Sequence, residues 1–437
     1  MVFWFDPRDL IVGPFVRCPN CGEEQFGIHI VGGCSYQRRC RNCWHGARFA
    51  LPELSRQVLY VDQFVISNMM KALDGTHPRH QATAADPFWR TLFERLDRLV
   101  KLQVVICPPS DVHRSESLVS AYYEPLKRMS EQLSQGVSFD EVEVISQRQL
   151  YVALNAWLQG QPPQFEFAPE RVTHGGLNDW KEPLIISVRM SYPQAVIAAT
   201  RTFRDEVHRK VTALFAEEIH SAEQKEFKYW LDRERSVGAN AVLQSHALSQ
   251  QRMADMVAGR VPFDFDNMYS SSGLKKYQLV EQVLEDHEVS EQDIPQRIKA
   301  FLESDAYRDF PANRITALVW AAIDQAAALG QSEPPNAGTA NDVHVLTLLP
   351  FCDAMFVDNG CRALWEKVPK RFRPPYARAR LFSYNTRDKS LTYLDELEAQ
   401  ADPAVLASAR ELYGEPQPYV TMYNDERARE ARRRPPR

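Results

Sequence analysis

The sequence lacks any long apolar run and any leader-like start. None of its segments reaches the ~18 consecutive apolar residues that cross a membrane, and its opening, MVFWFDPRDL, lacks the charged-then-apolar layout of a signal peptide. It also lacks internal repeats and an excess of basic residues, since the net charge is −5. These absences predict a cytoplasmic protein with no membrane partner. They exclude a generally basic nucleic-acid binder but not local basic patches.

Cysteine is scarce, with 8 in 437 residues, yet four cysteines form two closely spaced pairs. Cys18-Pro-Asn-Cys21 and Cys40-Arg-Asn-Cys43 each place two thiolates on a tight turn, and two such turns supply the ligands of a closed tetrahedral zinc site. A thioredoxin-like redox pair would need a βαβ context, and a disulfide framework would need an oxidising compartment. The sequence indicates neither, so we predict a zinc ribbon with structural zinc over residues 1–55.

The composition, 44% hydrophobic and 25% charged, is typical of a globular chain, and the length suits one large core or two to three domains of ~150 residues. Residues 58–61 are β-branched, aliphatic or aromatic, which favours a strand buried on both faces, and residues 64–73 have the spacing of an amphipathic helix. Asp62 between them fits the carboxyl end of a strand in an open α/β sheet, where ligands bind. It fits equally well as the residue that caps the helix.

Two further acids stand on predicted helices. The apolar residues 104–107 form a second predicted strand that two prolines break. The helix after it carries Glu116 in its early turns, where an acid is also favourable simply because of the helix dipole. Residues 341–349 are predicted to form a short helix capped by Asn341, which places Asp342 at its start.

Residues 351–359 are typical of a third buried strand, with Asp353 inside it and Asp358 at its end. The Asp-Asn-Gly sequence there also suits a hairpin turn, but the residues that follow favour a helix over a partner strand. Residues 126–309 contain long helical segments broken by short loops, which we interpret as a helical insertion. Residues 401–437 end in a basic run, and we expect this tail to be partly disordered.

The segments YVDQFVISN, VVICPPSDVHRSES and NDVHVLTLLPFCDAMFVDN resemble the corresponding stretches of bacterial PIN-like nucleases. The order of strands, helices and acids along the chain is similar as well. The resemblance implies an α/β fold with a PIN-like three-layer α/β/α core around a central, mostly parallel sheet, built from residues 56–125 and 310–400. The helical insertion is much larger than in a minimal PIN domain, and the zinc ribbon is appended in front of the core.

Carboxylates gathered in one cleft at strand ends repel each other and would take up protons unless cations neutralise them, so such a cluster implies Mg2+ or Mn2+. One or two such ions can activate a water and stabilise the charge that develops on a scissile phosphate. We expect Asp62, Glu116 and Asp342 to be metal ligands, with Asp358 bound directly or through water. Asp353 is a second catalytic candidate from the same stretch.

Other side chains are expected to orient ligands or substrate: Gln63, Ser67, His344 and Asn359. Basic residues that could contact nucleic acid are Arg38, Arg39, Arg41, Lys370, Arg371 and Arg373. A solvated charged surface is the more frequent meaning of the arginine cluster on the ribbon, and a solvated loop explains the other three nearly as well. The resemblance favours an endonuclease that cleaves RNA rather than single-stranded DNA, with a toxin or antiviral effector as its biological role. A protein partner or a second copy could dock through the zinc ribbon or the helical insertion. The alternative is a non-catalytic zinc-ribbon and PIN-like protein that binds nucleic acid or a partner.

Overall fold

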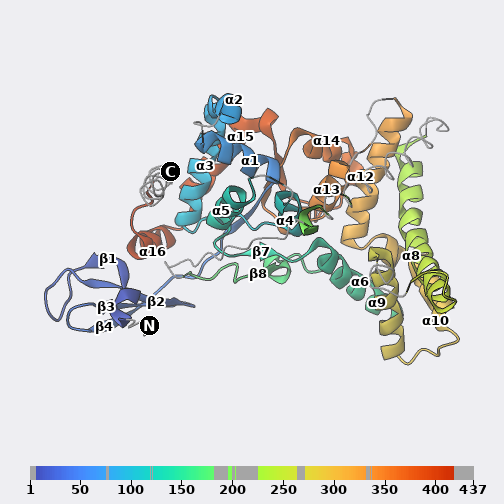
Figure 1. Cartoon of the computed structure of the whole chain (residues 1–437), viewed down its shortest axis with the longest axis horizontal. Helices are drawn as coiled ribbons and strands as arrows, with labels where there is room; N and C mark the ends of the chain where they lie inside the picture. The colour runs from blue at the N-terminus through green and yellow to red at the C-terminus, as the bar shows by residue number, and fades with distance from the viewer. Residues whose placement is uncertain are drawn as a thin grey trace.

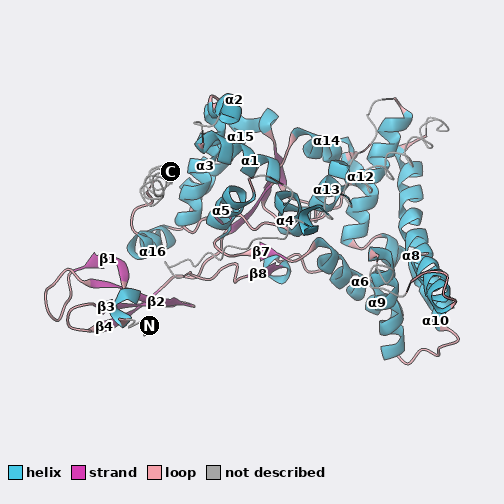
Figure 2. Cartoon of the chain, viewed as in Figure 1, coloured by secondary structure: helices cyan, strands magenta, loops and turns pink. Residues whose placement is uncertain are grey.

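A computed structural model describes residues 6–74, 78–118, 120, 122–181, 195–198, 202, 225–262, 271–330, 335 and 337–417. The molecule is elongated: an antiparallel sheet lies at one end, a parallel sheet with its helices lies in the middle, and long helices lie at the other end (Figure 1). Helices make up most of the described chain (Figure 2). Among the described residues, no helix has both the length and the apolar character that a membrane crossing requires.

The N-terminal sheet follows a short 3-10 helix, η1 (Pro7–Leu10). Its strands are antiparallel in the order β1 (Val12–Val16), β2 (Phe26–Gly32), β3 (Ser35–Cys40) and β4 (Gly46–Ala50). Side chains of a strand alternate between its faces, and in β3 every second residue is buried. The buried side, which we call the inner face, packs Ile28 and Tyr36 against Val405 and Leu412 of α16 (Pro403–Tyr413).

The middle sheet contains only parallel strands, in the order β10 (Arg380–Phe382), β9 (Ala354–Phe356), β5 (Gln57–Val61) and β6 (Val105–Ile106). From β5 the chain moves to β6 on one side and later returns to β9 on the other side. The strand order therefore reverses between β5 and β9. In open α/β sheets such a switch point leaves a crevice at the carboxyl ends of the two strands.

Helices cover both faces of this sheet, and β5 contributes alternate residues to the two sides. Leu59 and Val61 join one hydrophobic cluster with the helices α1 (Gln63–Leu73), α3 (Pro87–Lys101), α5 (Tyr123–Ser134) and α15 (Arg387–Gln400). Val58 and Tyr60 join another with α12 (Pro311–Ala328), α13 (Ala337–Leu346) and α14 (Asn359–Lys367). The chain is therefore mixed α/β and mostly helical, with its central strand buried on both faces.

A third cluster holds the helical end of the molecule together. Phe301, Phe310 and Leu154 lie in it, among residues of α6 (Val142–Leu158), α8 (Phe227–Val257), α9 (Ser272–Asp286), α10 (Ile294–Leu302) and α11 (Asp305–Arg308). Helix α8 packs along both α9 and α12, which connects this end to the sheet. The other elements are η2 (Pro78–His80), α2 (Gln81–Ala84), α4 (Asp111–Leu118), β7 (Ser138–Phe139), η3 (Pro169–Val172), β8 (Thr173–His174), η4 (Leu349–Phe351), η5 (Lys370–Phe372) and η6 (Tyr384–Thr386).

Two expected boundaries differ from the structure. Helix α13 begins at Ala337, so Asn341 lies within the helix and does not cap it. Residues 337–340 contain no proline, so the helix can include them, and the Asn341 amide bonds Glu116 instead. Part of the expected tail is helix α16, whose apolar side covers the N-terminal sheet, while the basic run at residues 427–437 lies outside the described residues.

Arg56, directly before β5, is a buried hydrogen-bond donor that ties three loops to the sheet. Its Nη1 donates to the side-chain oxygens of Gln103 (3.1 Å) and Gln135 (3.0 Å), and its Nη2 donates to the Leu177 carbonyl. Burial lowers the pKa of Arg56 to about 10, so the group stays charged at neutral pH. The guanidinium therefore satisfies several buried acceptors at the point where the N-terminal sheet joins the parallel sheet.

Replacing Arg56 with leucine should lower the free energy of unfolding by about 3 kcal/mol or more, because several buried oxygens would lose their donor. Urea denaturation measures the change. Arg90→Leu is the control, since the Arg90 side chain is 55% exposed and surface substitutions usually shift stability by less than about 0.5 kcal/mol. Equal losses in the two variants would contradict the role given to Arg56.

Candidate functional site

The two CxxC pairs fold into equivalent turns. The Gly22 N–H donates to the Cys18 carbonyl (2.9 Å), and the Trp44 N–H donates to the Cys40 carbonyl (3.0 Å). Both donors have left-handed φ angles, 76° at Gly22 and 62° at Trp44. Trp44 is therefore the counterpart of Gly22 in the second turn.

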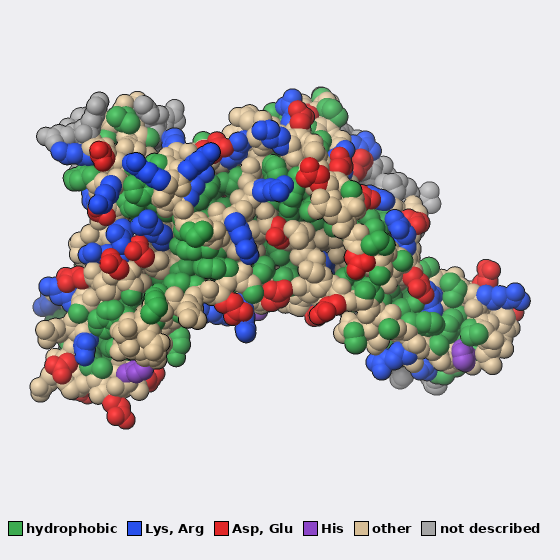
Figure 3. All heavy atoms as spheres, turned by 180° about the vertical axis from the view of Figure 1, so that it is seen from behind, with side chains coloured by type: hydrophobic (Ala, Val, Ile, Leu, Met, Phe, Trp, Pro, Cys, Tyr) green, Lys and Arg blue, Asp and Glu red, His purple; other side chains and the backbone are tan. Residues whose placement is uncertain are grey.

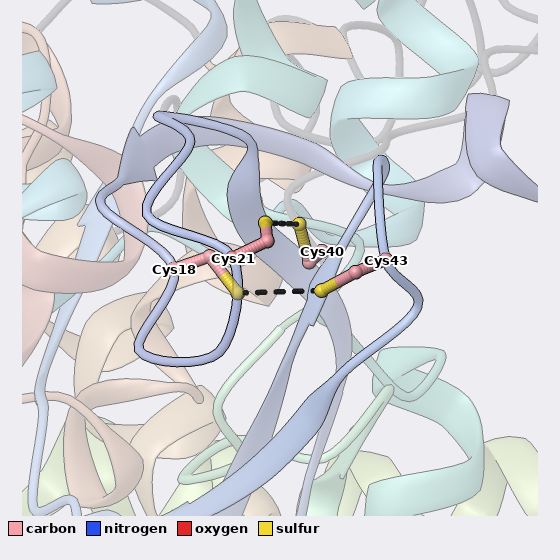
Figure 4. A group of neighbouring side chains, drawn as sticks. All are labelled: Cys18, Cys21, Cys40 and Cys43. Atoms are coloured by element: carbon pink, nitrogen blue, oxygen red, sulfur yellow. Dashed lines mark hydrogen bonds between the residues drawn. The ribbon is translucent and has the colours of Figure 1, made fainter.

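The four cysteine sulfurs meet between these turns (Figure 4). Sγ of Cys18 lies 3.6 Å from Sγ of Cys43, and Sγ of Cys21 lies 3.6 Å from Sγ of Cys40. A disulfide would need about 2.05 Å, whereas tetrahedral zinc with bonds of about 2.3 Å spaces its sulfurs about 3.8 Å apart. All four ligand atoms lie within 4.8 Å of one another. The geometry and the soft sulfur donors fit a structural zinc ion.

A second group of polar side chains lies where β5 and β9 end. Asp62 follows β5 directly, and its N–H donates to the Phe356 carbonyl of β9 (2.8 Å). Asp358 follows β9 with only Val357 between them. Each aspartate also caps a helix: Asp62 accepts from the Phe64 N–H (3.2 Å) and Asp358 from the Cys361 N–H (2.7 Å). The strand-end and capping interpretations of Asp62 are thus both correct.

Glu116 of α4 and Asp342 of α13 line the same pocket as Asp62 and Asp358. We call this pocket of about 580 Å³ the acidic cleft; its wall also contains Lys367. All four acids are half-buried. The Asn341 side-chain amide donates to Oε1 of Glu116 (2.7 Å), which joins α13 to α4 across the cleft.

The carboxyl groups of the cleft make each other harder to ionise. Burial, then the nearby Glu116 and Asp358, raises the pKa of Asp62 to about 7. Burial, followed by Asp358, Asp62 and Glu116, raises the pKa of Asp342 to about 8. Yet only the cysteines, among the described residues, form a set of three or more potential ligands with atoms all within 4.8 Å. The acids are close enough to repel but are more widely spaced than the sulfurs.

Asp353 is not part of the acidic cleft, which corrects the expectation drawn from the sequence. Its Oδ2 accepts from the Val58 N–H (2.8 Å) at the amino end of the parallel strands. Because β5 and β9 run in the same direction, this end of the sheet is opposite to Asp62 and Asp358. Asp353 anchors the start of the β5–β9 pairing instead.

Four other candidates are not among the residues that line the cleft. His344 lies on α13, and the charged groups that interact electrostatically with its ring are Asp111, Glu143 and Lys276. Gln63 lines a different pocket, beside α4 and α5. The remaining two also stand outside the residues that line the cleft: Asn359, which accepts from the Asn385 N–H (3.2 Å), and Ser67 of α1.

Three of the six basic residues expected to contact nucleic acid are bound to backbone carbonyls. Arg38 is 2% exposed and donates to Pro14 and Phe26. Arg41 donates to Ile11, and Arg373 donates to carbonyls at the end of α14. The many N–H donors of a guanidinium suit such carbonyls. The expectation fails for the buried Arg38, whereas nucleic-acid contact by the half-buried Arg41 and Arg373 stays a prediction.

The other three, Arg39, Lys370 and Arg371, are partly or fully exposed. The guanidinium of Arg39 lies over the Trp44 ring, with 4.7 Å between its Cζ and the ring centroid. Over the face of the molecule seen in Figure 3, basic side chains are interspersed with acidic ones. Charge alone therefore does not identify a nucleic-acid surface.

His113 is a buried residue of the site that the sequence did not reveal. Its Nδ1 accepts from the Ser110 N–H (3.0 Å), so the proton is on Nε2, which donates to the Val61 carbonyl (2.5 Å). Burial lowers the pKa of His113 to about 4, which keeps the ring neutral. His113 thus fixes the peptide directly before Asp62. In the sequence, the only local sign of this role was the short spacing between Ser110 and His113, which allows the side chain to accept from the Ser110 N–H.

No protein-family model, no curated protein and no solved structure matches this chain. The two candidate sites therefore depend on their own geometry and chemistry.

Protein purified without chelators should contain about one zinc per chain, because closed thiolate sites hold their metal and contribute folding energy. Cys18→Ser should lose the zinc and destabilise the N-terminal sheet. Cys34→Ser is the matched control, since Cys34 is exposed and outside the group of four. Metal analysis and thermal unfolding measure both effects. A folded, zinc-free wild-type protein would disprove the assignment.

The metal-free protein should lose stability as the pH rises from about 4 to 8. The folded protein keeps the Asp342 proton up to about pH 8, whereas an unfolded chain releases it near pH 4. The folded state thus binds more protons in this window, and its free energy of unfolding falls with pH by at most about 1.4 kcal/mol per unit and proton.

Asp342→Asn should flatten this pH profile and should gain stability relative to wild type toward pH 8. Urea unfolding at several pH values without divalent metal measures it. Thr339→Ala, a neutral change in the same pocket, should leave the slope unchanged. Parallel profiles for wild type and Asp342→Asn would show that the carboxyl does not titrate in this window.

Proposed function

We propose that this chain is a metal-dependent nuclease that cleaves RNA in the acidic cleft, on a PIN-like core. Its main support is the position of Asp62 and Asp358 at the carboxyl ends of neighbouring parallel strands, where the strand order reverses. Ligand sites of open α/β sheets lie at such points. Glu116 and Asp342 come from two further helices and line the same pocket, in the sequence order that resembles PIN-like nucleases.

The donor atoms of the cleft suit a hard divalent cation. Carboxylate oxygens are the ligands that Mg2+ and Mn2+ prefer. The pKa values of Asp62 and Asp342 are raised by burial and then by the neighbouring carboxylates, whose repulsion a cation would relieve. Asp62, Glu116, Asp342 and Asp358 are the residues that would hold it. Bound there, such an ion would activate a water and neutralise charge on the scissile phosphate.

Other side chains in the cleft and behind it would orient ligands and substrate. Asn341 holds Glu116 in position, and His113 holds the peptide before Asp62. Lys367 on the pocket wall offers a charge for a phosphate. Phe64 lines the pocket and is 44% exposed, which offers a ring on which an unpaired base can stack. A single-stranded substrate therefore suits the cleft.

The preference for RNA over single-stranded DNA follows from the resemblance to PIN-like nucleases, and so does the proposed role as a toxin or antiviral effector.

The second candidate function is a non-catalytic protein that binds nucleic acid or a partner. The spacing of the carboxylates favours it, because they are not gathered as closely as the cysteine sulfurs. A working nuclease would draw the four carboxylates together when it binds its metal.

The decisive assay measures cleavage of labelled RNA and single-stranded DNA with Mg2+ or Mn2+. Asp62→Asn and Asp342→Asn should each lower the rate on the order of a hundredfold or more, and Glu116→Gln nearly as much, since each removes one charge from the metal site. Asp353→Asn is the matched control because its carboxyl lies at the opposite end of the sheet.

All variants are compared at equal folded concentration. Unchanged activity of Asp62→Asn would reject the site. A wild-type protein that cleaves nothing with either metal would favour the non-catalytic binder.

A further inference from the structure

The side of the N-terminal sheet opposite α16 carries aromatic and basic side chains. Strand pairing sets Gln37 opposite Arg48 and Arg39 opposite Gly46, so these positions share one side of the sheet. The His29 ring contacts Gln37 on this side (Nδ1 to Oε1, 3.4 Å), and Trp44 lies under Arg39. We call this surface the outer face; it consists of His29, Ile30, Gln37, Arg39, Trp44 and Arg48.

The two faces of the sheet differ in what covers them. On the inner face, Tyr36 and its neighbours pack on α16 and Trp180. On the outer face, Arg48 is exposed, Ile30 is 51% exposed and Trp44 is 38% exposed. Among the described residues, the cluster that joins the sheet to α16 and Trp180 includes none of the six residues of the outer face. The inner face is therefore buried against other parts of the chain, whereas the outer face is accessible to solvent.

The outer face has the chemistry of a stacking surface. The Trp44 ring is flanked by the Arg39 guanidinium (4.7 Å to the ring centroid) and by the His29 ring (6.2 Å between centroids). The buried Nε of Arg39 has no hydrogen-bond partner among the described residues. Gly46, which pairs with Arg39, has no side chain, so nothing projects from β4 beside the arginine. Proteins that bind single strands combine such aromatic rings with arginines that contact the backbone.

We propose that the outer face binds single-stranded RNA, with a base stacked on Trp44 and phosphates held by Arg39 and Arg48. Charge complementarity supports an anionic partner, because the two charged side chains of the face are arginines. A base can stack on the Trp44 ring only if it is not already stacked between neighbouring bases. This requirement excludes a duplex. The choice of RNA rests on the proposed function, and Gln37 and His29 add hydrogen-bonding atoms that suit a 2′-hydroxyl.

The outer face would hold the RNA away from the point of cleavage. Strand β4 leads through residues 51–56 to the amino end of β5, whereas the acidic cleft lies at the carboxyl end of that strand. Figure 1 shows the N-terminal sheet at one end of the molecule, apart from α4, α13 and α14. A strand that occupies both surfaces must be long, so short RNAs would reach the cleft without help from Trp44.

The test measures RNA binding by the full-length Asp62→Asn protein, using fluorescence anisotropy of a labelled unstructured RNA without divalent metal. Trp44→Leu should weaken binding by about tenfold, because it removes one base-stacking contact. Trp44→Phe should keep most of the affinity since the ring remains. Zinc content is measured in each variant, because Trp44 is next to a zinc ligand.

A second variant tests the phosphate contact without touching the cysteine turns. Arg48→Gln should weaken binding and reduce the slope of log affinity against log salt by about 0.7, the value for one lost contact on a single strand. Arg252→Gln is the charge-matched control, because Arg252 is exposed on α8 at the other end of the molecule. It should leave both the affinity and the slope unchanged.

Unchanged affinity in both Trp44→Leu and Arg48→Gln would overturn the proposal, as would duplex RNA or single-stranded DNA that binds as tightly as single-stranded RNA. Binding requires no cleavage, so the two proposals can fail separately. A protein that cleaves RNA but binds it without Trp44 and Arg48 refutes only the outer face. A protein that binds RNA through these residues but never cleaves it refutes only the nuclease.

Discussion

The parallel pairing of β5 with β9 is the interaction on which the acidic cleft depends. It aligns Val61 with Phe356 and ends with the hydrogen bond from the Asp62 N–H to the Phe356 carbonyl. Helices α1 and α14 then leave toward opposite faces of the sheet, so their first turns diverge from one crevice. Because each helix begins at a capping aspartate, the pairing places two carboxylates on either side of that crevice.

The capping role and the proposed metal-binding role of these aspartates can be separated chemically. A cap requires a side-chain oxygen that accepts a backbone N–H, and asparagine provides one nearly as well as aspartate. Metal binding requires the negative charge. The Asp→Asn changes therefore preserve the starts of α1 and α14 while removing the charge, whereas alanine at Asp62 or Asp358 would damage both roles at once.

Local patterns in the sequence predicted the strand at residues 58–61, the helix after it and the cysteine group, all of which the structure confirms. Each of these signals lies within a few residues along the chain. Asp353 and Arg38 were misjudged because their partners are distant: Asp353 bonds the start of β5, and Arg38 bonds carbonyls of other strands and of α16. Long-range hydrogen bonds leave no local pattern.

The buried Arg38 also explains why one face of the N-terminal sheet is buried and the other is exposed. Its Nη1 donates to the Pro14 and Phe26 carbonyls, and its Nη2 donates to the Glu411 carbonyl of α16 (3.0 Å). One guanidinium therefore fixes β1, β2 and α16 to each other, which commits the inner face to the interior. Strand alternation then forces Arg39, the next residue, onto the opposite side. Two adjacent arginines thus differ in their surroundings: Arg38 holds β1, β2 and α16 together, whereas Arg39 lies on the outer face, where we propose that it contacts RNA.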